Sequence, residues 1–203
     1  MLLLVILIKP LAGEVTIGSN TAIWYNTTIR GDLNPIRIGL NTSIGDHTTI
    51  HTVASVSTGT TASVNIGKNV IIGSHCSLCS CHIGDGCYIA HNCTILPGAR
   101  LEDSCILSPG SVVPPGRLIP TNQVWGGNPV EYIRPLDYSE DLANYMFSYS
   151  HVDIGAMHKA LYSFLPNAYM MKPATKEEYK VPEHRKEYYH IHDLEEALDE
   201  KYP

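Results

Sequence analysis

An aliphatic residue returns at every sixth position through the middle of this chain, and no other feature of the sequence restricts the fold as much. The longest uninterrupted run comprises Ile83, Ile89, Ile95, Leu101, Leu107, Val113 and Ile119. A period of six fits neither an α-helix, which repeats near 3.6 residues, nor the simple alternation of a strand. Three hexads form one coil of a parallel β-helix, whose interior is a column of aliphatic side chains. We therefore predict an all-β, left-handed parallel β-helix, an exception to the usual right-handed crossover.

The same repeat is present upstream, with interruptions. It comprises Ile17, Ile23 and Ile29, then Ile38, Ile44 and Ile50, then Ile66, Ile72 and Leu78. The uncharged stretch 52–65 has the composition of a loop inserted into one hexad. With that insertion Ile50 and Leu78 lie one coil apart. His51 and Cys79, which follow them, are then expected to stack at about the 4.8 Å spacing of paired strands.

Three regions are expected: a β-helix over 1–135, one or two helices within 136–165, and a charged extension over 166–203. Asp137 and Glu140 have the spacing of a helix-capping pair, and Ser139 is the alternative cap. Apolar residues at helical spacing predict a stripe that packs along the β-helix, comprising Leu142, Tyr145, Met146, Tyr149, Ile154, Met157, Leu161 and Phe164. The extension has too few aliphatic residues for a core of its own. It is either a solvated tail or, as its tyrosines favour, an arm on a neighbouring chain.

Charge and length exclude two classes of protein. The net charge of −6 over 203 residues gives no basic footprint for nucleic acid. The apolar run Leu2–Ile8 is far shorter than the roughly 20 residues that span a bilayer. It also lacks the basic region and cleavage site of a signal peptide. We interpret it as a buried first strand, with contact to a membrane or a membrane-bound partner as the alternative.

The cysteines permit two interpretations. The spacing Cys76-x-x-Cys79-x-Cys81 would suit a metal cluster. The hexad register instead places five of the six at the slot for a small core residue, namely Cys76, Cys81, Cys87, Cys93 and Cys105. We favour core filling for these five. Cys79 alone falls outside that slot.

Several segments occur in the order in which one enzyme family has them. They are Ile23-Trp24-Tyr25-Asn26, Arg30-Gly31-Asp32, Ile44-Gly45-Asp46, Ile50-His51, Val70-Ile71-Ile72-Gly73, Ile83-Gly84-Asp85-Gly86, Ser111-Val112-Val113-Pro114-Pro115-Gly116 and Gly127-Asn128-Pro129. Single hexads are shared with many acyltransferases, but this ordered set resembles the γ-class carbonic anhydrase family over about residues 15–165. The resemblance implies a trimer of left-handed β-helices with a metal held between neighbouring subunits on three histidines.

Two of the three implied metal ligands differ in this chain. The first histidine matches His51, whereas Ser74 and Cys79 occupy the positions of the second and third. His75 and His82 lie near these positions but out of register, and a shift of one residue sends a side chain to the other face of a strand. We expect structural or surface roles for them, as for His47 and His91.

Other parts of the implied active site have changed as well. The family has acidic residues in the loop after the first histidine and a Gln before the Asp that matches Asp46. Here residues 52–65 contain no acid, and Gly45 stands at the Gln position. The hydration of carbon dioxide, which is the reaction of this family, needs a metal that activates water and a route for the released proton. We therefore predict a degenerate site with no catalytic residue, in which His51 and Cys79 are vestigial metal ligands.

The alternative is an active γ-class carbonic anhydrase with an altered zinc site, in which partner chains complete the set begun by His51 and Cys79. Binding of bicarbonate or carbon dioxide without catalysis also stays open. A hexapeptide acyltransferase would need a histidine in an extended loop, and residues 52–65 contain none.

The resemblance further implies that Arg30, Asp32 and Asp46 make ionic contacts between subunits, where such pairs fix register. We expect a structural subunit in a heterotrimer with two other chains of this family. In plants, algae and protists such proteins lie on the matrix side of the membrane arm of mitochondrial respiratory complex I. The implied location is therefore peripheral, on the inner mitochondrial membrane.

Overall fold

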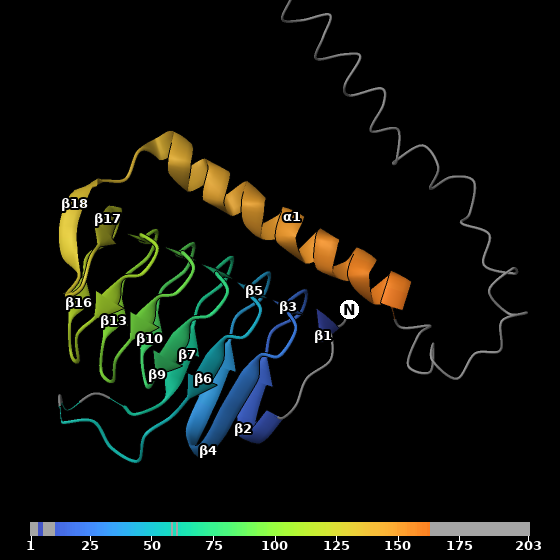
Figure 1. The fold of residues 1–203 in the computed structure, drawn as a ribbon, viewed down its shortest axis with the longest axis horizontal. Coiled ribbons are helices and arrows are strands. Elements are labelled where there is room, and N and C mark those ends of the chain that lie inside the picture. Colours follow the sequence, from blue (N-terminus) through green and yellow to red (C-terminus); the bar gives the residue numbers. More distant parts are fainter. Residues whose placement is uncertain (1–3, 6–10, 58, 60, 163–203) are drawn as a thin grey trace, which may run out of the picture. The chain divides into compact units, whose positions relative to one another are not determined.

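The chain winds into a three-sided parallel β-helix with one long helix along its side (Figure 1). The computed structural model describes residues 4–5, 11–57, 59 and 61–162. Strands of successive coils pair in parallel and in register on each side. The prediction of a parallel β-helix followed by a helical segment is confirmed.

Three faces, which we name A, B and C, form the sides of the β-helix. Face A contains β1 (Leu4–Val5), β3 (Ala22–Ile23), β5 (Ser43–Ile44), β8 (Ile71–Ile72), β11 (Tyr88–Ile89), β14 (Ile106–Leu107) and β17 (Gln123–Gly126), with β18 (Glu131–Pro135) antiparallel at its end. Face B contains the first part of β4 (Thr28–Ile38), then β6 (Thr49–His51), β9 (Ser77–Cys79), β12 (Thr94–Ile95) and β15 (Val112–Val113). Face C contains the last part of β4, with β7 (Val64–Ile66), β10 (His82–Ile83), β13 (Arg100–Leu101) and β16 (Leu118–Ile119). The strand β2 (Leu11–Ile17) pairs in parallel with β4.

The aliphatic repeat forms the core, as the sequence predicts. Ile50 and Leu78 are paired across coils and are both fully buried. In the last coil Trp125 takes the place of the aliphatic residue in the core. The inserted loop is slightly shorter than expected and spans 52–63, because β7 begins at Val64.

The slot for small residues has a hydrogen-bonding role that the repeat alone does not reveal. At one corner of the β-helix the Thr48 hydroxyl donates to the Gly73 carbonyl at 3.0 Å, and the Cys76 thiol one coil later donates to the Ala90 carbonyl at 3.2 Å. Each side chain thus links its coil to the next. The five cysteines expected to fill the core do belong to it, and all six are free thiols.

The predicted helices are a single helix, α1 (Tyr138–Tyr162), which runs along the β-helix and contacts β1, β3, β5 and β8 of face A (Figure 1). Its predicted apolar stripe does not form the contact. Leu142, Met146 and Met157 are 53%, 63% and 55% exposed, whereas Ser148, Val152 and Gly155 are buried. Val152 packs against Ala22 of β3.

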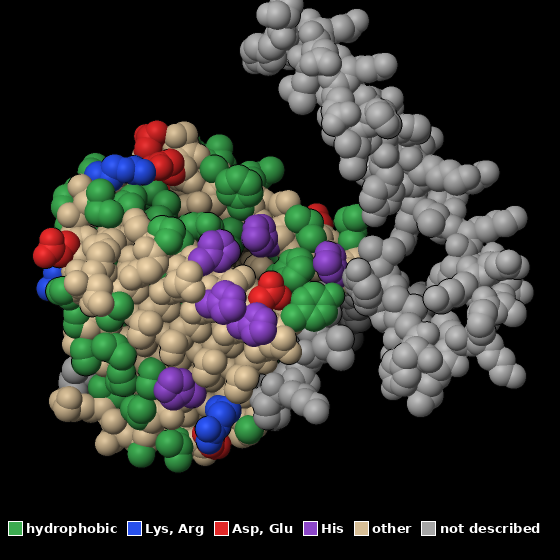
Figure 2. Space-filling model, in the orientation of Figure 1, with side chains coloured by type: hydrophobic (Ala, Val, Ile, Leu, Met, Phe, Trp, Pro, Cys, Tyr) green, Lys and Arg blue, Asp and Glu red, His purple; other side chains and the backbone are tan. Residues whose placement is uncertain are grey.

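The expectation for the stripe was wrong because a helix lies closest to a flat sheet face through its small side chains, which leaves the longer ones beside the contact. Tyr145, Tyr149 and Ile154 are also exposed, and the side chains of Leu161 and Phe164 lie outside the described part of the chain. Figure 2 shows hydrophobic side chains at the surface of the molecule. Exposed apolar side chains therefore lie along α1, among polar ones such as Ser150 and Asp153.

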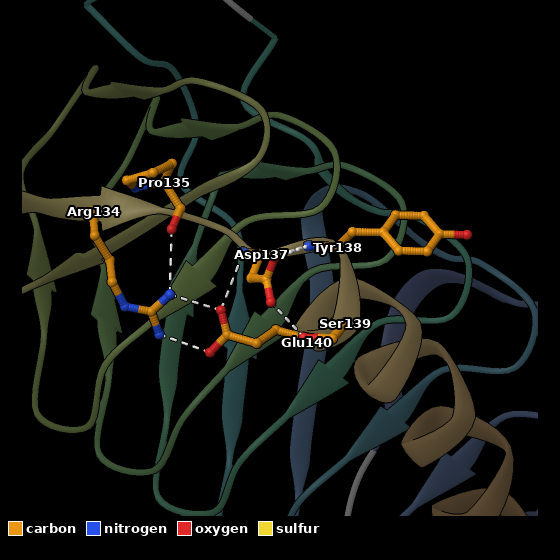
Figure 3. A network of polar contacts seen from close by, with 6 residues as sticks. All are labelled: Arg134, Pro135, Asp137, Tyr138, Ser139 and Glu140. Atoms are coloured by element: carbon orange, nitrogen blue, oxygen red, sulfur yellow. Dashed lines mark hydrogen bonds and ion pairs between the residues drawn. The ribbon is translucent and has the colours of Figure 1, made fainter.

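The start of α1 is fixed by the predicted capping pair and by one arginine (Figure 3). The backbone N–H of Asp137 donates to the Glu140 carboxylate at 3.2 Å, which is half of a capping box. Arg134, on β18, holds the same carboxylate with two hydrogen bonds of 2.6 and 2.7 Å. This exposed cluster joins the end of the β-helix to the helix.

Two expectations fall wholly or partly outside the described residues. The extension 166–203 is outside them, and of the apolar run Leu2–Ile8 the structure describes β1, which pairs with β3. Among the residues described here, no helix has the length and apolar character needed to span a membrane.

Candidate functional site

Arg30, His51 and Cys79 lie at matching positions on three successive strands of face B. Arg30 on β4 pairs in register with His51 on β6, which pairs with Cys79 on β9. The predicted stacking of His51 on Cys79 is therefore confirmed. The two residues stack because the 52–63 loop is inserted without shifting the register of the coils before and after it.

The two candidate metal ligands in this column differ in their readiness to bind an ion. His51 is partly buried, and its Nδ1 is a buried atom with no hydrogen-bond partner. An unpaired buried nitrogen is costly, and a metal or a hydrogen-bond donor from another chain would satisfy it. Cys79 is buried, and burial raises the pKa of its thiol. The thiolate, which is the form that binds metal, is therefore disfavoured.

Ser74 lies at the corner between faces A and B, in the turn between β8 and β9. Its backbone N–H donates to His91 Nδ1 at 2.9 Å. The two positions therefore belong to different elements, a turn at the corner for Ser74 and a strand of face B for Cys79.

The residues of this chain alone do not fit a zinc centre. The described residues include no group of three His, Cys, Asp or Glu side chains that could hold a metal ion. His82 lies on face C. His47 and His75 occupy corner positions with positive φ, where His is enriched, and their rings stack at 4.9 Å between centroids. Within the part of the chain that the structure describes, no histidine completes a ligand set with His51 and Cys79.

The three residues expected at a subunit interface have partners within the chain. Arg30 and Asp32 form an ion pair of 2.6 Å with side chains that are 56% and 39% exposed. The hydrogen bond from Arg30 lowers the pKa of Asp32. Asp46 accepts a hydrogen bond from the backbone of Tyr25 at 2.9 Å. Arg30 and Asp32 are thus exposed on the coil, while Asp46 holds the corner in shape.

One gathering of polar residues was missed by the sequence analysis. The ring of His158 lies 5.3 Å from Trp24 and 6.3 Å from Tyr25, between centroids, in edge-on contacts. His151 lies one heptad earlier on α1, and its pKa is lowered by burial and by the nearby His91. Figure 2 shows several histidines on this face of the molecule. The spacing of seven between His151 and His158 was the signal that could have placed both on one side of a helix.

Comparisons with known proteins agree with the hexapeptide-repeat β-helix fold. Residues 80–115 match the family model described as bacterial transferase hexapeptide (six repeats). Gamma carbonic anhydrase 2, mitochondrial, of Arabidopsis thaliana is 36% identical over 73 residues, which is 36% of this chain and 26% of that protein. Gamma carbonic anhydrase-like 1, mitochondrial, of the same plant is 39% identical over 73 residues, or 36% and 29% of the two chains. The chain thus spans less than a third of the length of these relatives.

Solved structures match over a larger share of the fold. A putative acetyltransferase from Bacillus cereus is 30% identical, with a TM-score of 0.66, over 74% of this chain and 88% of that one. A hexapeptide transferase family protein from Anaplasma phagocytophilum is 29% identical, also with a TM-score of 0.66, over 72% and 82% of the two chains.

Proposed function

The chain belongs to the hexapeptide-repeat family of parallel β-helix proteins and has γ carbonic anhydrases and their mitochondrial "like" proteins among its homologues; from this we propose that it is a structural, non-catalytic subunit. In this proposal it assembles with two other chains of the γ carbonic anhydrase family. The trimer attaches to the membrane arm of mitochondrial complex I, on the matrix side, and supports the assembly or stability of that complex.

The observation that carries the proposal is the state of the three metal-ligand positions. They hold one histidine, a buried thiol with a raised pKa, and a serine in the turn between β8 and β9. A serine hydroxyl is a poor zinc ligand beside His and Cys. Without a metal to activate water, the reaction of the enzyme family has no nucleophile.

Face B has the character of a surface that pairs with another chain. Its outward residues before the buried repeat are Thr28, Thr49, Ser77, Thr94 and Val112. None of them is charged, and the one charge in the adjacent column, on Arg30, is paired with Asp32. The cores of protein interfaces are depleted of charge. This supports assembly as the role of the face that holds His51 and Cys79.

Association with mitochondria and with complex I rests on the homologues. Those named as mitochondrial include both gamma carbonic anhydrases and gamma carbonic anhydrase-like proteins. The exposed apolar side chains of α1 offer a surface for a large assembly. These points support the location proposed here.

One observation favours the alternative of an active enzyme. The buried Nδ1 of His51 has no hydrogen-bond partner, and His51 pairs in register with Cys79. These two residues and a histidine from a partner chain would make a His2Cys set of zinc ligands. In that case turnover would depend on a mixed trimer and not on this chain alone.

The test is purification of the tagged chain from mitochondria of its own organism, followed by native gel separation and a carbon dioxide hydration assay. We expect it to migrate with complex I together with homologous chains. The hydration rate of the isolated trimer should be unchanged by His51→Ala. Thr49→Ala, which removes an outward side chain from the same strand without removing a metal donor, is the matched control.

Two results would reject the proposal. Recovery as a free homotrimer would remove the complex I assignment. Loss of hydration activity and of bound zinc in His51→Ala, with both retained in Thr49→Ala, would establish the enzyme instead.

A further inference from the structure

A pocket of about 470 Å³ lies outside the face B column, between the 52–63 loop and face C. Its floor is a row of three polar side chains on successive strands, Asn65, His82 and Arg100, which are paired in register. Such rows repeat at about 4.8 Å, so neighbouring side chains can contact one ligand together. The volume is in the range of small-molecule sites.

The loop that forms the other wall is tied down at both of its ends. The buried Ser80 hydroxyl donates to the Ala62 carbonyl at 2.6 Å and accepts a hydrogen bond from the backbone of Val53 at 2.8 Å. Ser80, at the corner of faces B and C, thus holds both ends of the loop. The pocket is therefore a built feature of the coil.

Hydroxyl and amide groups connect the loop to the floor. Asn65 Nδ2 donates to the Ser63 hydroxyl at 3.1 Å, and that hydroxyl donates to Thr61 at 3.1 Å. The remaining N–H of the Asn65 amide and the hydroxyl of Thr61 are hydrogen-bond donors at the pocket wall. Neutral donors beside a cation are the groups that bind carboxylates and phosphates in proteins.

The charges around the pocket favour an anion. No acidic residue lines it. Within the described part of the chain Arg100 has no ion-pair partner, since the two ion pairs found there are Arg30 with Asp32 and Arg134 with Glu140. His82 is flanked by Arg100 on β13, and the acids that act on it, Asp85 and Asp103, lie outside the pocket.

We propose that this pocket binds a small organic anion with a phosphate or carboxylate head group, held by Arg100 and His82 against Asn65 and the loop hydroxyls. The site is separate from the metal-ligand positions on face B and does not depend on the proposed structural role. Its signature is a coupling to protons. Burial and Arg100 lower the pKa of His82 in the free protein, and a bound anion should raise it.

The experiment titrates the full chain with phenyl phosphate, benzoate and inorganic phosphate at physiological ionic strength, by calorimetry and by NMR of the His82 ring. We expect at least one of the three probes to bind and to raise the His82 titration midpoint. The first two probes share a ring and differ in head group, so they identify which head group the site prefers. Arg100→Gln should weaken the binding by about tenfold or more, as expected for loss of a charged hydrogen bond. His82→Gln should remove the pH dependence of binding.

Arg37→Gln is the matched control, because Arg37 lies on the same column of face C, pairs with Asn65 and does not line the pocket. It should bind the probe as the wild type does. An equal loss of affinity in both arginine variants would mean that the probes respond to the general positive charge of the surface. That result would overturn the proposal. Unchanged binding in Arg100→Gln, or no binding of any probe at 20 mM, would overturn it as well.

Discussion

At the scale of single residues, the position of a side chain in the hexad decides whether it serves the core, the corner or the outer face. His51 and Cys79 follow a core residue and so point outward on face B, where they meet. His75 comes three residues after the core residue Ile72, out of that register, and occupies a corner with positive φ. The sequence could therefore predict the His51 and Cys79 stack and the exclusion of His75 from it.

The sequence could not predict the state of these residues. Cys79 is buried although it lies outside the core slot, and His51 Nδ1 has no hydrogen-bond partner. Both features depend on the surrounding side chains and not on the repeat. The partnership of Arg30 with Asp32 within one chain is likewise a matter of rotamers.

The Arg134 and Glu140 pair provides a prediction at this scale. Its hydrogen bonds lower the pKa of Glu140 to about 2. A carboxyl whose pKa is lower in the folded state stabilises that state above its unfolded pKa of about 4.3. This contribution is lost as the pH falls from there toward the folded pKa. We expect the carboxyl carbon of Glu140 to titrate near pH 2 in an NMR experiment, and at a higher pH in Arg134→Gln, which keeps only the hydrogen bond from the Asp137 backbone. A wild-type midpoint above pH 4 would contradict the pairing in solution.

At the scale of elements, the coils were predictable because a period of six leaves no choice about which residues face inward. The coil made from β7, β8 and β9 keeps its phase despite the inserted loop, since parallel pairing restores the register on both sides. The contact face of α1 was not predictable from its apolar residues. Ser148 and Gly155 carry no hydrophobic signal, yet they allow the close approach.

The core column predicts a large loss of stability for truncation inside a coil. Leu78 is fully buried between Ile50 and Ile95. Leu78→Ala should lower the free energy of unfolding by about 2–5 kcal/mol, measured by denaturant titration. Leu118→Ala makes the same change on an exposed strand position of face C and should shift it by less than about 0.5 kcal/mol. Similar values for the two variants would mean that the column is not the main source of stability.

The contact of α1 with the first coils should weaken in acid. His151 is exposed on one side, and partial desolvation together with His91 lowers its folded-state pKa. The docked helix is therefore fully stable above the unfolded pKa of about 6.5 and loses stability as the pH falls through that value toward the folded pKa. We expect hydrogen exchange of the α1 amides, corrected for intrinsic rates, to rise between pH 7.5 and 5.5, and to rise less in His151→Gln.

His82→Gln is the comparison for this effect, since the pKa of His82 is also lowered but the residue lies on face C. It should leave the exchange of α1 unchanged at every pH. If it had the same effect as His151→Gln, the acid response would be a property of the whole chain and not of the helix contact.

At the scale of the whole molecule, the described residues form two surfaces suited to contact with another chain. One holds the exposed apolar side chains of α1, and the other is face B with its uncharged rows and the unpaired nitrogen of His51. The sequence indicated association through the family resemblance and through the tyrosines of the 166–203 extension. The buried His51 Nδ1 without a hydrogen-bond partner adds a physical reason, because a group from another chain would satisfy it.

Face B therefore provides the prediction for assembly. Thr49→Arg places a cation in the middle of the outward row between Thr28 and Ser77, where a contact with another chain would have to bury it. We expect native mass spectrometry to show the proposed trimer reduced to smaller species. Leu118→Arg introduces the same charge on the exposed outer side of face C and should leave the proposed trimer intact. An intact trimer in Thr49→Arg would move the interface away from face B and from the column that holds His51 and Cys79.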